Sequence, residues 1–143
     1  MSDERFVLDT SALLAFMLGG KDADVVEEIL NDKRHRVFVP WPVLAEIYYV
    51  TRRRRGEKEA DRRYVLVKEL PVSIIWQLEE PEILTAARLK GDYPLSFADA
   101  LIAAAAASRA AVLVHQDSEF EALRGILRQR FLGSVSSAES EKK

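Results

Sequence analysis

The stretch FVLDTSALL (residues 6–14) decides the fold class of this protein. It begins with a short apolar run, Phe6–Leu8, that shows no alternation of apolar and polar residues. Such a run is typical of a parallel strand that is buried on both faces. A helical pattern follows over Ser11–Leu18. The stretch therefore predicts a buried strand that leads directly into a helix.

The same alternation continues along the chain, and Gly or Pro residues stand at the expected helix ends. The runs predicted as strands are Phe6–Leu8, Val37–Val39, Val72–Ile75 and Val112–Val114. The segments predicted as helices are Ser11–Leu18, Asp24–Leu30, Val43–Arg55, Glu57–Leu70, Glu82–Lys90, Ser96–Ser108 and Ser118–Leu127. Strands that alternate with helices predict a three-layer α/β/α sandwich with a mostly parallel central sheet.

Length and composition narrow the class of protein further. The chain has 143 residues and no cysteine, which excludes disulfide scaffolds, thiolate metal sites and cysteine nucleophiles. We expect a single domain over residues 1–133 and a mobile polar tail, SVSSAESEKK, over residues 134–143. No apolar stretch is long enough to span a bilayer, so we expect a soluble, cytoplasmic protein without a membrane partner.

Acidic residues stand close to the ends of two predicted strands. Asp9 directly follows the first strand, and Asp117 comes shortly after the last one. Ligands of parallel sheets gather beyond the carboxyl ends of the strands, so these two carboxylates are candidates for a shared site. Each also has a structural explanation, because Asp is a common N-cap of a following helix. The spacing of Ser96 and Asp99 likewise resembles a capping box.

Two acids lie where a surface helix would place apolar side chains. Glu46 shares a helical stripe with Val43 and Val50, and Asp99 shares one with Leu95 in an otherwise apolar helix. A buried carboxylate must be neutralised, paired or bound to a metal ion.

Few basic residues stand near these acids in the sequence. Four converging carboxylates without fixed cationic partners would raise one another's pKa values, and a divalent cation would resolve that conflict. Oxygen ligands without Cys and with little His favour Mg²⁺ or Mn²⁺ over zinc. The pattern therefore predicts an Mg²⁺ or Mn²⁺ site.

Four motifs in a fixed order resemble those of the PIN-domain nucleases, and specifically of the VapC-type toxins of toxin–antitoxin pairs. They are LDTSALL, LAEIYY, SFADALIAAAA and HQDSEFEAL. The resemblance covers the chain apart from its tail. It implies that Asp9, Glu46, Asp99 and Asp117 are the acidic catalytic residues.

The resemblance also implies a role for each of these residues. Asp9, Asp99 and Asp117 are the preferred direct metal ligands, whereas Glu46 would hold the metal through water or orient the nucleophile. Two auxiliary residues match the family as well, namely the hydroxyl of Ser11 near the first acid and a variable acid, Glu119.

The implied activity is Mg²⁺- or Mn²⁺-dependent hydrolysis of RNA phosphodiester bonds, which leaves 5′-phosphate and 3′-hydroxyl ends. The implied partners are an RNA substrate, a small cognate antitoxin and a second copy of the chain in a homodimer. The competing interpretation is a catalytically silent PIN-like module that binds RNA or protein.

His115 departs from the family pattern, which usually has Thr or Ser two residues before the fourth acid. A histidine here could donate a hydrogen bond to Asp117 or to a phosphate, and nearby acids would favour its protonated form. Alternatively, His115 ends a strand and packs.

Basic residues concentrate in one segment of this acidic chain. Arg52–Arg63 has a net charge of +4, whereas the whole chain has a net charge of −2. We interpret Arg52, Arg53, Arg54 and Arg55 as a possible RNA-binding run. In the second half of the segment, ion pairs such as Glu59–Arg63 favour a solvated helix instead. The predicted helix Glu57–Leu70 carries an apolar stripe at Ala60, Tyr64 and Val67, and by resemblance this region contributes to an antitoxin groove.

Overall fold

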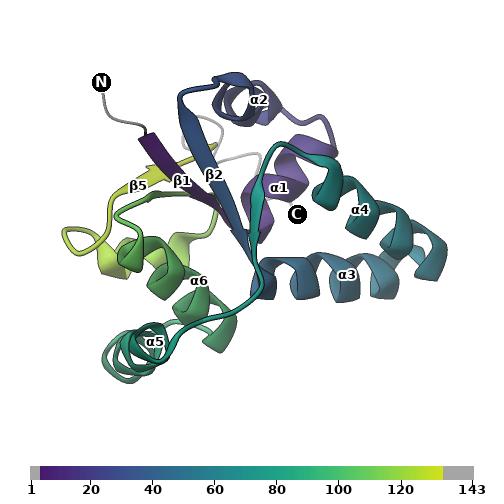
Figure 1. Cartoon of the computed structure of the whole chain (residues 1–143). Helices are drawn as coiled ribbons and strands as arrows, with labels where there is room; N and C mark the ends of the chain where they lie inside the picture. Colours follow the sequence, from purple (N-terminus) through teal and green to yellow (C-terminus); the bar gives the residue numbers. More distant parts are fainter. Residues whose placement is uncertain (1–3, 134–143) are drawn as a thin grey trace.

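The computed structural model describes residues 4–133, so the predicted tail at residues 134–143 lies outside the described residues. Strands and helices alternate through most of the described chain (Figure 1). In chain order the elements are β1 (Glu4–Leu8), α1 (Thr10–Met17), α2 (Ala23–Asn31), β2 (His35–Pro40), α3 (Trp41–Arg55), α4 (Glu57–Glu69), β3 (Ser73–Ile75), α5 (Glu80–Asp92), α6 (Phe97–Ser108), β4 (Val112–His115), the 3₁₀ helix η1 (Ser118–Leu123) and β5 (Gln129–Phe131).

The five strands form one parallel sheet in the order β3-β2-β1-β4-β5. β1 is the central strand, and its Leu8 lies beside Val114 of β4. Because all strands run the same way, their carboxyl ends meet at one edge. The predicted parallel sheet is thus confirmed, and the ends of β1 and β4 are neighbours.

Helices cover both faces of the sheet, as the three-layer prediction requires. Val7 and Leu8 point to opposite faces of β1, and both are fully buried. α1 and α6 both contact β1 and β4, and they do so from opposite sides (Figure 1). The hairpin of α3 and α4 extends away from the sheet. α6 is buried along most of its length, where its alanines allow close packing between the sheet and α5.

Two elements near the C-terminus differ from the sequence prediction. The segment predicted as the helix Ser118–Leu127 forms only the short 3₁₀ helix η1, and Gly125 then adopts a positive φ of 88° in the turn that follows. β5 was not predicted, because its residues are polar or exposed. It is an edge strand that pairs with β4 alone, so it needs no continuous apolar run.

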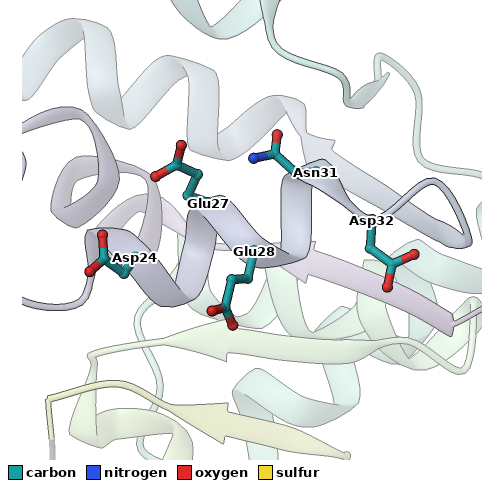
Figure 2. A pocket seen from close by; sticks show the side chains of 5 residues that line it. All are labelled: Asp24, Glu27, Glu28, Asn31 and Asp32. Atoms are coloured by element: carbon teal, nitrogen blue, oxygen red, sulfur yellow. The ribbon is translucent and has the colours of Figure 1, made fainter.

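α2 has apolar residues on one face and acidic residues on the other, as is typical of a surface helix. Val26, Ile29 and Leu30 are buried. The opposite face carries acids that project in different directions around a surface groove (Figure 2). Within residues 4–133, none of the helices combines the length and the apolar character needed to cross a bilayer.

Candidate metal centre

Asp9 lies at the end of the central strand and caps the helix that follows. Its Oδ1 accepts a hydrogen bond from the backbone N–H of Ala12 at 2.8 Å, so the N-cap interpretation is confirmed. The hydroxyl of Ser11 donates to the same carboxylate, with its oxygen 2.8 Å from Oδ1 and 3.0 Å from Oδ2. Ser11 Oγ also accepts from the backbone N–H of Gln116 at 2.8 Å. Ser11 therefore ties the end of β1 to the loop after β4.

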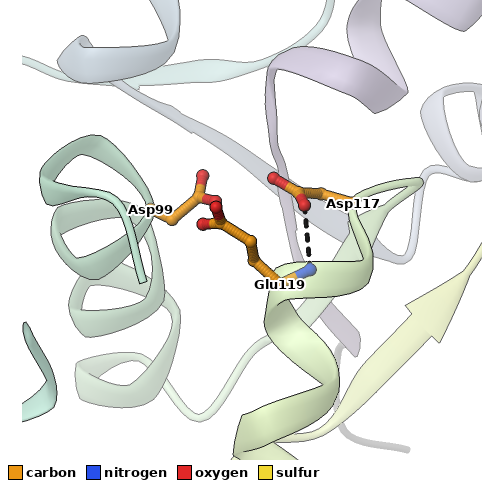
Figure 3. Close-up of side chains that lie close together, drawn as sticks. All are labelled: Asp99, Asp117 and Glu119. Carbon is orange, nitrogen blue, oxygen red and sulfur yellow. Dashed lines mark hydrogen bonds between the residues drawn. The ribbon is translucent and has the colours of Figure 1, made fainter. Parts of the chain in front are cut away.

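Three carboxylates converge beside this point. Asp99 at the start of α6 faces Asp117 and Glu119 from the loop and 3₁₀ helix after β4 (Figure 3). One oxygen from each of the three lies within 4.8 Å of the others. The side chain of Asp117 is held by the backbone N–H of Glu119, which donates to its Oδ1 at 2.9 Å. Segments that are distant in sequence thus bring three acids together.

The start of α6 explains why Asp99 points toward the other acids. Ser96 caps the helix, since its Oγ accepts from the backbone N–H of Asp99 at 3.1 Å. In a complete capping box Asp99 would accept from the backbone N–H of Ser96 in return. That N–H donates instead to Glu119 Oε1 at 3.0 Å. The capping box is therefore only half formed, and the Asp99 carboxylate is directed to the acidic cluster.

Glu46 is half-buried on α3, next to the buried residues Val43 and Ile47, as the helical stripe predicts. Its Oε1 accepts a hydrogen bond from the hydroxyl of Thr10 at 2.5 Å. The sequence analysis did not identify Thr10, because a Thr beside a strand end carries no signal of its own. The contact joins α3 to α1 next to Asp9.

Burial gives these acids unusual electrostatics. It raises the pKa of Asp9 to about 7, and the negative charges of Asp117 and Glu46 add to the effect. Burial also raises the pKa of Asp99 to about 9, together with hydrogen bonds and repulsion from Asp117 and Glu119. In the part of the chain described, no ion pair includes any of these five acids. The cluster therefore lacks a fixed counter-charge.

The group of three differs in one member from the predicted ligands. We expected Asp9, Asp99 and Asp117, but the closest set contains Glu119, which we had named as an auxiliary acid. The Asp9 carboxylate is oriented by hydrogen bonds from Ala12 and Ser11. Asp9 lies beside the group of Asp99, Asp117 and Glu119 and is not a member of it. All members are oxygen donors, which fits Mg²⁺ or Mn²⁺.

His115 does not act as the sequence analysis first suggested. Its side chain is fully buried, so it cannot reach a phosphate, and burial lowers its pKa rather than raising it. Its Nδ1 accepts a hydrogen bond from the backbone N–H of Asp117 at 3.1 Å. The expectation of a protonated donor is therefore wrong, because desolvation outweighs the nearby negative charges. The alternative, a residue that ends β4 and packs, is confirmed.

The basic segment divides as its sequence suggested. In the second half of the segment, Arg63 is nearly buried and forms an ion pair with Glu59 at 3.0 Å. This arginine therefore contributes to contacts within the α3–α4 hairpin. The side chains of residues 52–55 are exposed along the end of α3, the helix that carries Glu46. Arg52 lies 3.8 Å from Glu57, and Arg53 lies over the ring of Tyr49.

The apolar stripe of α4 faces inward. Ala60 and Val67 are fully buried, so they pack within the protein. The apolar surface left on this side of the hairpin is formed by Val65 and Leu66, in a groove whose rim includes Arg55 and Lys58.

Several solved structures share this fold. VapBC-1 from nontypeable Haemophilus influenzae has a TM-score of 0.69 and 23% identity, over 89% of this chain and 97% of that chain. DNA-bound VapBC from Salmonella typhimurium has a TM-score of 0.70 and 17% identity, over 90% and 98% of the two chains. VapC20 of Mycobacterium tuberculosis, described as a sarcin-ricin loop cleaving toxin, has a TM-score of 0.65 and 19% identity, over 82% and 93%.

Sequence comparison assigns the family. No curated protein sequence matches the chain. The family model described as "PIN domain" matches residues 6–126, which is well over half of the chain and includes Asp9, Glu46 and the three converging acids. The chain therefore belongs to the PIN domain family.

Proposed function

We propose that this protein is the ribonuclease toxin of a toxin–antitoxin pair and that it hydrolyses RNA phosphodiester bonds with a divalent cation. The observation that carries the proposal is the convergence of Asp99, Asp117 and Glu119 beside Asp9, with no ion pair to any of them among residues 4–133. Membership of the PIN domain family supports it. The fold is also shared with VapBC complexes and with a sarcin-ricin loop cleaving toxin.

The residues present fit an Mg²⁺ or Mn²⁺ ion. The converging carboxylates of Asp99, Asp117 and Glu119 would hold the ion, and Asp9, which lies beside them, would complete the set as the further predicted ligand. When bound, such a cation neutralises charge on the phosphate and activates a water molecule for in-line attack. At neutral pH without a cation, Asp99 holds a proton because its pKa is about 9. We therefore expect Asp99 to release that proton when the site is loaded.

The other polar residues of the site position groups that act on the substrate. Glu46 lies on a separate helix and is held by Thr10, so it is placed to orient the attacking water. Ser11 fixes the Asp9 carboxylate through its hydroxyl. The exposed run at residues 52–55 continues along the helix of Glu46, and we propose that it receives the RNA backbone.

We propose two protein partners, a small cognate antitoxin and a second copy of the chain, both in the cytoplasm. Several solved structures with this fold are toxin–antitoxin complexes. The exposed groove on the α3–α4 hairpin, with Val65 and Leu66 among basic and acidic side chains, offers a surface for an antitoxin segment.

The decisive experiment incubates the purified protein with a mixed RNA pool, with and without EDTA, beside the variant Asp99→Asn. We expect cleavage by the wild type, loss of cleavage in EDTA, and recovery when Mg²⁺ or Mn²⁺ is restored. Equal cleavage by both proteins would indicate a contaminating nuclease and would defeat the enzyme hypothesis. Binding of Mg²⁺ without cleavage would favour the catalytically silent module instead.

A further inference from the structure

A chain of hydrogen bonds connects the edge strand β5 to the acidic cluster. The backbone N–H of Asp117 donates to His115 Nδ1 at 3.1 Å. His115 Nε2 lies 2.8 Å from Gln129 Oε1, and Gln129 Nε2 donates to the backbone carbonyl of Phe120 at 3.0 Å. The chain thus begins and ends on the backbone of one short segment, residues 117–120.

The two backbone ends determine the direction of every bond between them. A backbone N–H can only donate, so His115 Nδ1 carries no proton and His115 Nε2 carries one. A carbonyl can only accept, so the amide of Gln129 turns its nitrogen to Phe120 and its oxygen to His115. One arrangement of donors and acceptors therefore satisfies all three contacts.

Packing encloses this chain of contacts. His115 is fully buried, with its ring centroid 4.8 Å from that of Phe120 and 5.5 Å from that of Phe131. The residue directly after β5 also bonds to His115, since the backbone N–H of Leu132 donates to the carbonyl of His115 at 2.7 Å. The hydrogen-bonded pair of His115 and Gln129, called the relay below, is therefore packed on both sides.

We propose that Gln129 is a positioning residue, which acts through His115 to fix the turn that carries Asp117 and Glu119 and so strengthens divalent-cation binding. The anchored segment contains Asp117 at its start and Glu119 in its interior, so its conformation decides where both carboxylates lie. Partners beyond the direct ligands commonly change metal affinity by about 10- to 100-fold.

The role of Gln129 rests on the proposed function, because it assumes a divalent-cation site. The test measures Mn²⁺ binding to the full chain by calorimetry. Gln129→Met conserves volume but removes both side-chain hydrogen bonds of Gln129. We expect it to weaken Mn²⁺ binding by about tenfold. The matched control is Arg130→Met, the next and exposed residue of β5, which we expect to bind Mn²⁺ within about twofold of the wild type.

Two further measurements separate positioning from simple stabilisation. Thermal unfolding in EDTA reports stability, and a purely structural role would lower the melting temperature of Gln129→Met without changing its Mn²⁺ affinity. Nitrogen-15 NMR of His115 in the wild type should show a neutral ring with the proton on Nε2; a proton on Nδ1 would overturn the relay. If Gln129→Met fails to fold, Gln129→Glu, which can accept from His115 but cannot donate to Phe120, takes its place.

The outcomes distinguish the two proposals. Wild-type protein that binds no Mn²⁺ would overturn the metal-dependent function and, with it, the role of Gln129. Mn²⁺ binding by the wild type that is unchanged in Gln129→Met would overturn the relay alone.

Discussion

Within residues 4–133, two groups of acidic side chains can be compared, and of these two the second has the environment of a reactive site. The first lies on the surface around α2 (Figure 2), and the second lies at the carboxyl edge of the sheet, where Figure 3 shows its members Asp99, Asp117 and Glu119. The members of the surface group are Asp24, Glu27, Glu28 and Asp32, and those of the edge group are Asp9, Glu46, Asp99, Asp117 and Glu119.

The two groups differ in burial and in partners rather than in residue type. Asp32 forms an ion pair with Arg34 at 2.8 Å, which holds the pKa of Asp32 well below its usual range. Asp9 and Asp99 are buried, have no basic partner and show raised pKa values. Acids on one exposed helix remain ordinary charges, whereas acids gathered from several elements need an external cation or protons.

The largest expected difference between the groups is in RNA cleavage. Asp9→Asn should lower the cleavage rate by roughly a thousandfold, because it removes several kcal/mol of stabilisation from a metal-dependent transition state. Asn is as good an N-cap as Asp, so α1 should remain intact. The matched control Asp24→Asn should retain the wild-type rate in the same assay, and an equal loss in both variants would erase the distinction between the groups.

Stability of the metal-free protein should depend on pH in the direction set by the edge group. Asp9 and Asp99 have pKa values of about 7 and 9 in the folded state, against 3.8 when unperturbed. At these two sites the folded protein holds more protons than the unfolded chain between about pH 4 and pH 9, so their contribution to stability falls as the pH rises. His115, whose pKa is lowered by burial, acts in the opposite direction below about pH 6.5, but it is a single group against two.

We expect the melting temperature in EDTA to drop by several degrees between pH 5 and pH 9. Added Mg²⁺ should reverse most of the drop at pH 9 and have little effect at pH 5, where protons compete for the carboxylates. A melting temperature that rises over this range in EDTA would contradict the raised pKa values.

Replacing Asp99 by a permanently neutral side chain should stabilise the metal-free protein, because Asp99 otherwise has to take up a proton when the chain folds at pH 8. In Asp99→Asn the amide remains neutral and can donate to the carboxylates of Asp117 and Glu119, which face it. We therefore expect the melting temperature in EDTA at pH 8 to rise by a few degrees, although cleavage is lost. A lower melting temperature would show that the acids do not repel one another.

The smallest effect is expected for the paired acid of the surface group. Asp32→Asn removes an exposed ion pair with Arg34, and such pairs contribute little. The melting temperature should change by no more than about two degrees, with cleavage unaffected. A much larger loss of stability would mean that the exposed pair matters more than its solvent exposure suggests.

The sequence predicted much of this architecture because local patterns carry it. The four apolar strands were identified from runs such as Phe6–Leu8, since burial on both faces requires uninterrupted apolar residues. β5 was not identified, because an edge strand with Gln129 and Arg130 beside a single apolar residue, Phe131, shows no such run. The 3₁₀ helix η1 was expected to be longer, because the turn at Gly125 depends on the loop that leads into β5.

By itself, the amino-acid sequence determined the layered α/β class and singled out the acids, because periodicity and a charge on an apolar face are local properties. Only the tertiary structure decided which oxygens meet. Glu119 takes the backbone N–H that would complete the capping box of Asp99, and His115 becomes a neutral spacer toward Gln129. These outcomes depend on hydrogen bonds between segments far apart in the chain, and no spacing along the sequence encodes them.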